Sequence, residues 1–82
     1  MYTVYVICSK KTKKYYTGYT ADIEKRLKAH NSGKNRSTRV GKPWILSYCE
    51  YYELKEDAWN RERQLKKYKT GEAFKKLIGR VA

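Results

Sequence analysis

The sequence predicts an α+β fold: a small three-stranded antiparallel sheet flanked by helices, in the order β-β-α-β-α-α. The prediction follows from strand-like runs that are separated by segments with helical patterning. The strand-like runs are rich in β-branched and aromatic residues and cover 1–8, 15–20 and 44–52. Helical patterning covers about 21–31, 54–68 and 70–79. A chain of 82 residues has room for one core, so we expect a single domain over 1–82.

The first two runs predict a β-hairpin. In a register that pairs Cys8 with Tyr15, Tyr5 lies opposite Gly18, and Tyr5 and Tyr16 share one face as diagonal neighbours. Because Gly18 has no side chain, we expect the Tyr5 ring to be uncovered, with space above the sheet. A shift of one residue would put the two tyrosines on opposite faces. The alternative to a functional pair is an aromatic ladder that only packs.

The first helix is expected to begin at residue 21 or 22, with Thr20 as its N-cap. Gly33 stands where a glycine that ends a helix is expected. Residues 34–42 then form a basic loop. The segment 25–42 contains seven Lys or Arg and no acidic residue.

Spacing assigns two faces to this helix. Ile23 and Leu27 mark the face toward the core. Asp22, Arg26 and His30 form the adjacent column, so Arg26 and His30 are expected one turn apart on the border between core and solvent. The alternative is a solvated helix edge with an ion pair between Asp22 and Arg26.

The second helix carries one residue that does not fit an apolar face. Leu54, Ala58 and Leu65 fall in a narrow stripe that should face the sheet. Glu62 falls in the same stripe, where a carboxylate costs free energy unless it is paired or binds a metal. The structural alternative is a Glu62 that pairs with an arginine or reaches solvent at the edge of that face.

The composition indicates a nucleic-acid partner. Twenty Lys and Arg against eight Asp and Glu give a net charge of +12, and small domains this basic most often bind DNA or RNA. The longest apolar stretch, 4–8, is far shorter than a membrane-spanning helix. The first residues do not have a signal-peptide pattern. Twelve aromatic residues argue against disorder.

The cysteines do not have the spacing of a metal site. Cys8 and Cys49 lie in separate strand-like runs, and His30 is the sole histidine, so a zinc site lacks ligands. We expect two free thiols and a cytoplasmic location. A disulfide between the two strands is the alternative.

In combination, these residues resemble the GIY-YIG nucleases, and most closely their small bacterial single-domain members of the YhbQ/YazA type. The matching positions are the triplets Thr3-Val4-Tyr5 and Tyr16-Thr17-Gly18, then Arg26, His30 and Glu62. The resemblance extends from about residue 2 to residue 79. One departure is Tyr19, which stands where some catalytic members have a lysine.

The resemblance implies a metal-dependent endonuclease that hydrolyses DNA phosphodiester bonds in repair or recombination, with little sequence specificity. It implies one Mg²⁺ or Mn²⁺ ion, held by Glu62 and weakly bound without substrate. Arg26 would bind the phosphate in the transition state. Tyr5 would orient or deprotonate the attacking water with help from Tyr16 and His30, and either Tyr5 or His30 could be the base.

The resemblance also implies contacts with the DNA backbone outside the catalytic centre. Four cations of the basic loop would bind phosphates without reading sequence: Lys34, Arg36, Arg39 and Lys42. We therefore expect a nucleic-acid partner, DNA rather than RNA, and no membrane contact. Without a targeting domain, the chain would find its substrate unaided or through a protein partner.

Two other interpretations stay open. A DNA- or RNA-binding module on the same scaffold, without catalysis, is favoured by Tyr19 and by the missing targeting domain. A ribosome-associated basic protein would explain the charge, but neither Glu62 nor the tyrosine pair.

Overall fold

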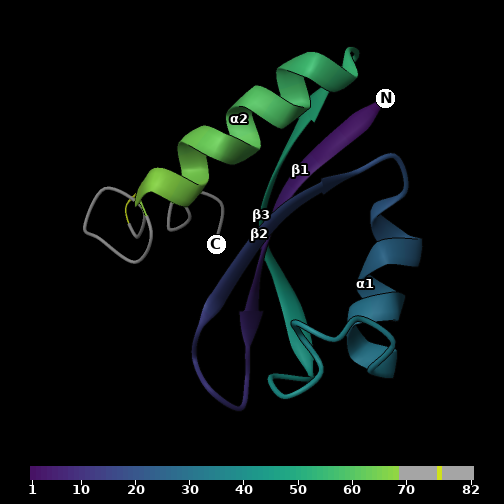
Figure 1. Ribbon diagram of the computed structural model, residues 1–82, viewed down its shortest axis with the longest axis vertical. Coiled ribbons are helices and arrows are strands. Elements are labelled where there is room, and N and C mark those ends of the chain that lie inside the picture. Colours follow the sequence, from purple (N-terminus) through teal and green to yellow (C-terminus); the bar gives the residue numbers. More distant parts are fainter. Residues whose placement is uncertain (69–75, 77–82) are drawn as a thin grey trace.

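Residues 1–68 fold as one antiparallel sheet with a helix on each face (Figure 1). The computed structural model describes these residues and Lys76. The elements are β1 (Tyr2–Ser9), β2 (Tyr15–Thr20), α1 (Ile23–Ser32), β3 (Trp44–Tyr52) and α2 (Lys55–Tyr68). The predicted α+β class is confirmed. The helix expected over 70–79 lies outside the described residues, apart from Lys76, and no described helix is long and apolar enough to span a membrane.

β1 is the central strand of the sheet, whose order is β2-β1-β3. Both of its neighbours run antiparallel to it. Because side chains alternate along a strand, β1 contributes to two separate cores. Val4 and Val6 are fully buried on the side of α2, and Tyr5 and Ile7 are buried on the side of α1.

A β-bulge in β3 lets that strand supply aromatic rings to both cores. The pairing with β1 shifts between Val6 and Ile7, which leaves Ser47 without a partner on β1. The extra residue reverses the alternation of side chains. Trp44 therefore packs in the core on the α1 face and Tyr48 in the core on the α2 face, although the two are four residues apart.

The two cysteines are free thiols, as predicted. Cys8 lies opposite Ile45, and Cys49 lies opposite Tyr5. The two cysteines therefore occupy different cross-strand pairs, and the alternative of a disulfide between the strands is wrong.

The cap of α1 differs from the prediction. Asp22 is the N-cap, and its carboxylate accepts a hydrogen bond from the Lys25 backbone N–H at 3.1 Å. Thr20 ends β2 instead, where its hydroxyl accepts from the backbone N–H of Asp22. An aspartate at the helix start also gains from the helix dipole, which a threonine does not. Gly33 ends the helix in the left-handed region, with φ of 82°, as predicted.

α2 packs on the sheet through fewer residues than the stripe predicts. Ala58 and Leu65 are fully buried, as expected. The prediction for Leu54 is wrong, because this residue precedes the helix and is 63% exposed. Leu54 contributes to the start of α2 through its main chain, because its carbonyl accepts a hydrogen bond from the Ala58 N–H.

Candidate active site

Tyr5 and Gly18 form a close pair across the hairpin. The predicted register is confirmed, with Cys8 opposite Tyr15 and Tyr5 opposite Gly18. The expectation of an uncovered Tyr5 ring is wrong, because the ring itself fills the space over Gly18 and is only 2% exposed. A Cβ at position 18 would lie 2.6 Å from the Tyr5 hydroxyl oxygen. The glycine therefore admits the Tyr5 ring over β2.

His30 is the hydrogen-bond partner of Tyr5. The Tyr5 hydroxyl lies 2.9 Å from Nε2 of His30, and the other ring nitrogen, Nδ1, lies 2.7 Å from the hydroxyl of Thr38. We expected His30 on the border between core and solvent, but its side chain is fully buried. The difference arises because the loop after α1 folds back and covers the ring with Thr38, which is itself 1% exposed.

Tyr16 lies on the same face and packs edge-on against the His30 ring, with 5.1 Å between ring centroids. Its place as a diagonal neighbour of Tyr5 is the predicted one. Tyr16 also packs against Trp44 at 6.4 Å and stays partly exposed. We call Tyr5, Tyr16, His30 and Thr38 the tyrosine–histidine cluster. Its residues come from β1, β2, α1 and the loop after α1.

The surroundings favour a neutral Tyr5 and a neutral His30. Burial is the largest cause that raises the pKa of the Tyr5 hydroxyl, and Tyr16 and Glu62 add to it. Burial, and after it the charge of Arg26, lower the pKa of His30. A neutral imidazole nitrogen can accept a hydrogen bond from a neutral phenol, which agrees with the 2.9 Å contact between the Tyr5 hydroxyl and Nε2 of His30.

Arg26 is exposed on α1, one turn before His30. Its charge acts on both members of the pair, because it lowers the pKa of Tyr5 as well as that of His30. The alternative of an ion pair with Asp22 is not found among the described residues, where the Asp22 carboxylate caps α1 instead. The guanidinium is therefore open to a ligand beside the Tyr5–His30 pair.

Glu62, the predicted metal ligand, lies on α2. Its side chain is 13% exposed and forms an ion pair with Lys66 at 3.1 Å, one turn along α2. The described part of the chain has no group of three or more His, Cys, Asp or Glu that could hold a metal. A single carboxylate fits a Mg²⁺-type ion only if water and substrate phosphate supply the other ligands, and only if Lys66 moves away.

The basic loop presents its cations to solvent. Lys34, Arg36, Arg39 and Lys42 are all exposed. Arg39 also donates from Nε to the Gly33 carbonyl at 3.0 Å, which orients this side chain. The loop is held in place from inside, because Trp44 Nε1 donates to the Thr38 carbonyl at 2.7 Å.

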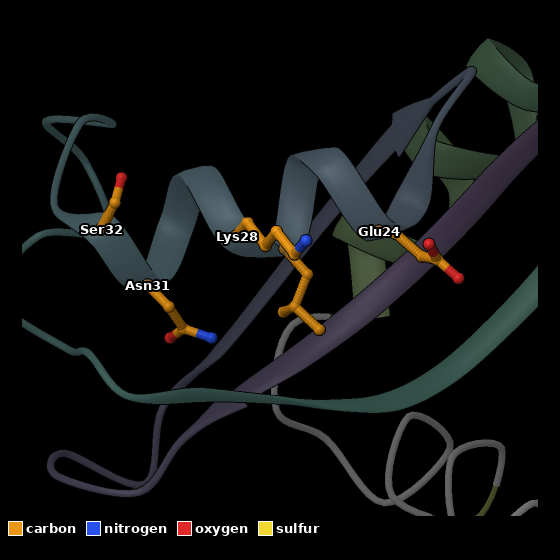
Figure 2. A pocket seen from close by; sticks show the side chains of 5 residues that line it. Glu24, Lys28, Asn31 and Ser32 are labelled. Atoms are coloured by element: carbon orange, nitrogen blue, oxygen red, sulfur yellow. The ribbon is translucent and has the colours of Figure 1, made fainter.

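A groove along α1 is separate from this cluster. Its volume is about 500 Å³, and it is lined by Glu24, Leu27, Lys28, Asn31 and Ser32. Figure 2 shows Glu24, Lys28, Asn31 and Ser32 spread along α1. Tyr5, Arg26 and His30 do not line it.

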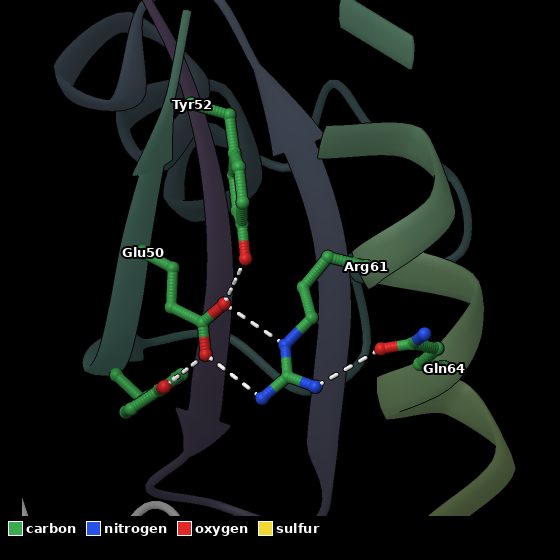
Figure 3. Close-up of polar contacts among 5 residues, drawn as sticks. Glu50, Tyr52, Arg61 and Gln64 are labelled. Atoms are coloured by element: carbon green, nitrogen blue, oxygen red, sulfur yellow. Dashed lines mark hydrogen bonds and ion pairs between the residues drawn. The ribbon is translucent and has the colours of Figure 1, made fainter. Parts of the chain in front are cut away.

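A second polar cluster, on the α2 face, was missed by sequence reasoning. Glu50 accepts from Nε and Nη2 of Arg61 at 2.9 and 3.1 Å, and from the hydroxyls of Tyr48 and Tyr52 (Figure 3). Burial alone would raise the pKa of Glu50, but the hydrogen bonds from Arg61 and the tyrosines outweigh it and lower the pKa. Arg61 also donates to Gln64 at 3.1 Å. The cluster ties α2 to β3, so the arginine next to Glu62 serves another carboxylate.

Thr38 is the residue of the site itself that sequence reasoning missed. It sits in a run of polar and basic residues, where nothing in the sequence marks one hydroxyl as buried. The signal that could have indicated it is Trp44, because a buried indole needs an acceptor and the nearby loop had to supply one.

Comparison with known proteins gives one consistent result. A family model described as the GIY-YIG catalytic domain matches residues 1–75. A UPF0213 protein of Streptococcus pyogenes serotype M5 (strain Manfredo) is 46% identical over 69 residues, which are 82% of this chain and 73% of that protein. A UPF0213 protein of S. pyogenes serotype M3 (strain ATCC BAA-595 / MGAS315) is 48% identical over 59 residues, 71% of this chain and 64% of that one. The solution NMR structure of a UPF0213 protein from Bacillus halodurans superposes with a TM-score of 0.56 at 31% identity and covers 99% of this chain and 85% of that chain.

Proposed function

This chain belongs to the GIY-YIG catalytic-domain family, and from that premise we propose that it is a divalent-metal-dependent endonuclease that hydrolyses DNA phosphodiester bonds. Membership in a nuclease superfamily supports a nuclease-type activity in general. The observation that carries the finer proposal is the buried hydrogen bond between Tyr5 and His30, 2.9 Å long, beside an exposed Arg26. A structural core does not need a neutral phenol and imidazole next to an open cation.

The Tyr5–His30 pair would act as the base. Tyr5 takes a proton from the attacking water as its own hydroxyl proton passes to Nε2 of His30. The water oxygen forms the new bond to phosphorus, the bond from phosphorus to the leaving oxygen breaks, and the proton held by His30 then passes through solvent water to that leaving oxygen. Because Tyr5 is nearly buried and Tyr16 is partly exposed, the substrate would approach from the Tyr16 side.

Arg26 would couple substrate binding to this proton transfer. In the free protein its charge lowers the pKa of His30, which makes His30 a weaker base. A phosphate bound to the guanidinium would offset that charge and so remove the smaller of the two causes, after burial, that lower the pKa of His30. The same contact would stabilise negative charge on the phosphate in the transition state.

Glu62 would hold the Mg²⁺ or Mn²⁺ ion, with water and substrate phosphate as the other ligands. When bound, such an ion neutralises phosphate charge and stabilises the leaving oxygen. Its affinity without DNA would be low, since one carboxylate is a small ligand set and Lys66 already pairs with it. Lys34, Arg36, Arg39 and Lys42 would bind backbone phosphates.

Three broader assignments belong to the same proposal. The chain would be a single domain over 1–82, since the family match spans 1–75. It would act in DNA repair or recombination, on DNA rather than RNA, alone or through a protein partner that targets it. Its location would be the cytoplasm, because Cys8 and Cys49 are free thiols of the kind that a reducing compartment maintains.

A binding module without catalysis is the second candidate. The observation that favours it is the raised pKa of Tyr5, because a phenol that resists ionisation is a poor base by itself. In that case the net charge of +12 would hold nucleic acid, and the Tyr5–His30 pair would only stabilise the hairpin.

A cleavage assay that compares the wild type with Glu62→Ala separates the nuclease from the binding module. The substrates are labelled single-stranded, flapped and four-way DNA, with RNA counterparts, in Mg²⁺, Mn²⁺ or EDTA. We expect the wild type to cut DNA only with metal, and Glu62→Ala to bind DNA without cutting it. Glu56→Ala is the matched control, because Glu56 is an exposed glutamate on the same helix, and it should cut as the wild type does. If the wild type cuts nothing but binds with a steep salt dependence, the binding module replaces the nuclease.

A further inference from the structure

Thr38 is buried against His30 and makes a side-chain hydrogen bond to it. Its side chain is 1% exposed, and its hydroxyl oxygen lies 2.7 Å from Nδ1 of His30. The same oxygen lies 3.4 Å from the carbonyl of Asn35, to which it can donate. A hydroxyl carries one proton and two lone pairs, so its two contacts constrain each other.

The protons can be arranged in two ways. In the first, Thr38 donates to the Asn35 carbonyl and accepts from an N–H on Nδ1 of His30, which leaves Nε2 to accept from the Tyr5 hydroxyl. This arrangement satisfies all three contacts. In the second, Thr38 donates to Nδ1, and Nε2 donates to Tyr5. That arrangement leaves the Asn35 contact without a proton, so the first is favoured.

We propose that Thr38 is a positioning residue that holds His30 in the tautomer protonated on Nδ1, so that Nε2 faces Tyr5 as a proton acceptor. Its catalytic consequence rests on the proposed nuclease function, whereas the tautomer itself does not. The proposal gives the basic loop a second role, because the segment that presents the phosphate-binding cations also supplies the partner of His30.

The position of Thr38 is itself fixed by three backbone contacts. Its carbonyl accepts from Trp44 Nε1 at 2.7 Å and from the Gly41 N–H at 3.2 Å. Its own N–H donates to the Asn35 carbonyl at 3.2 Å. The hydroxyl therefore has little freedom to move away from His30, and the loop holds it as a built part of the site.

The other groups around His30 do not select a tautomer at Nδ1. Tyr5 on β1 contacts Nε2, Tyr16 on β2 packs against the ring edge, and Arg26 on α1 acts through its charge. Among the described contacts, the Nδ1 atom is hydrogen-bonded by Thr38 alone. Removal of the Thr38 hydroxyl should therefore change the tautomer of His30, whereas removal of the Thr38 methyl group should leave the tautomer unchanged.

The test reads the tautomer directly by NMR. Since His30 is the sole histidine, the ¹⁵N shifts of its ring nitrogens can be assigned without ambiguity in labelled protein. At neutral pH we expect a protonated Nδ1 and an unprotonated Nε2 in the wild type and in Thr38→Ser, which keeps the hydroxyl. Thr38→Val keeps the shape and loses the hydroxyl, and should show a mixture or the opposite tautomer.

Two results would overturn the proposal: a wild type protonated on Nε2, or a Thr38→Val ring that keeps the proton on Nδ1. The wild-type spectrum decides the first even if Thr38→Val does not fold.

The cleavage assay tests the catalytic consequence. We expect Thr38→Val to lower the single-turnover rate on the order of 10- to 100-fold at unchanged DNA affinity, and Thr38→Ser to cut at the wild-type rate. A tautomer change without a change in rate would overturn the catalytic role. A wild type with the expected tautomer but no cleavage would contradict the proposed function instead.

Discussion

Tyr5, His30 and Thr38 form a continuous chain of hydrogen bonds inside the protein, and each of the three is buried. The register that sets Tyr5 opposite Gly18 follows from the alternation of side chains, and the structure has it as predicted. The burial of His30 could not be predicted, because it depends on where the loop after α1 folds and on one threonine within it. Periodicity within a helix gives the direction of a side chain, but not what another segment places over it.

Gly18 offers the sharpest steric prediction. A Cβ there would meet the Tyr5 hydroxyl oxygen at 2.6 Å, and Tyr5 cannot swing away without losing its bond to His30. We expect Gly18→Ala to lower the free energy of unfolding by about 1–3 kcal/mol, as overpacking does. Chemical denaturation measures this, and the same change in a Tyr5→Leu background should cost much less. An equal cost in both backgrounds would exclude the contact as the cause.

His30 should make stability depend on pH. Its folded pKa is lowered, so below the ordinary value of 6.5 the unfolded chain binds a proton that the folded protein does not. The free energy of unfolding should therefore fall as the pH drops from 7 toward the pKa of His30 in the folded protein. Below that pKa, His30 should cause no further change. We expect a His30→Gln variant to lose this slope between pH 7 and 5 in denaturation at constant ionic strength. If the free energy of unfolding changed with pH in the same way in the wild type and in His30→Gln, His30 would not be the source of the slope.

At the scale of elements, local patterns gave the strands and helices, while tertiary contacts decided their ends and faces. β2 and β3 have the predicted limits, because runs rich in β-branched and aromatic residues fill 15–20 and 44–52. The bulge at Ser47 could not be predicted, since nothing in a run of strand-forming residues marks which one lacks a partner. Leu54 is apolar and in phase with the stripe, yet it precedes the helix that would have turned it inward.

The ion pair between Glu50 and Arg61 joins α2 to β3, in addition to the buried Ala58 and Leu65. We expect Arg61→Leu to lower the free energy of unfolding by about 1–3 kcal/mol, because Glu50 would keep a partly buried charge without its main partner. Arg63→Leu is the matched control on the same helix, since Arg63 is exposed and lies over the Trp59 ring, 4.7 Å from its centroid. Thermal or chemical denaturation gives both values. Equal losses in the two variants would mean that the Glu50 pair is not what holds α2.

At the scale of the whole molecule, the net charge of +12 indicates a nucleic-acid partner, and the proposed contact surface is the basic loop. The exposed cations of the basic loop belong to the same loop that covers His30. Charge could be counted from the sequence, but the closeness of the loop to the tyrosine pair depends on how the chain folds back after α1.

The loop should therefore set the salt dependence of DNA binding. We expect a Lys34→Gln/Arg36→Gln variant to lose affinity for all sequences equally and to reduce the slope of log K against log salt by about 1.8, or about 0.9 per phosphate contact. Titrations at several salt concentrations measure it. Lys11→Gln/Lys13→Gln removes the same charge from the exposed turn between β1 and β2 and should change the slope less. The same loss of slope in both variants would mean that net charge, and not the loop, governs binding.

The most direct test of the site is the removal of one oxygen atom. Tyr5→Phe keeps the ring over Gly18 and deletes the hydroxyl that contacts His30. Single-turnover cleavage of flapped DNA in Mg²⁺ is compared with the wild type, with DNA affinity measured in EDTA and the fold checked by circular dichroism. We expect the rate to fall on the order of 10²- to 10⁴-fold at nearly unchanged affinity, which is the loss expected for a proton-transfer group. A folded Tyr5→Phe protein that cuts as fast as the wild type would contradict a catalytic role for the Tyr5–His30 pair.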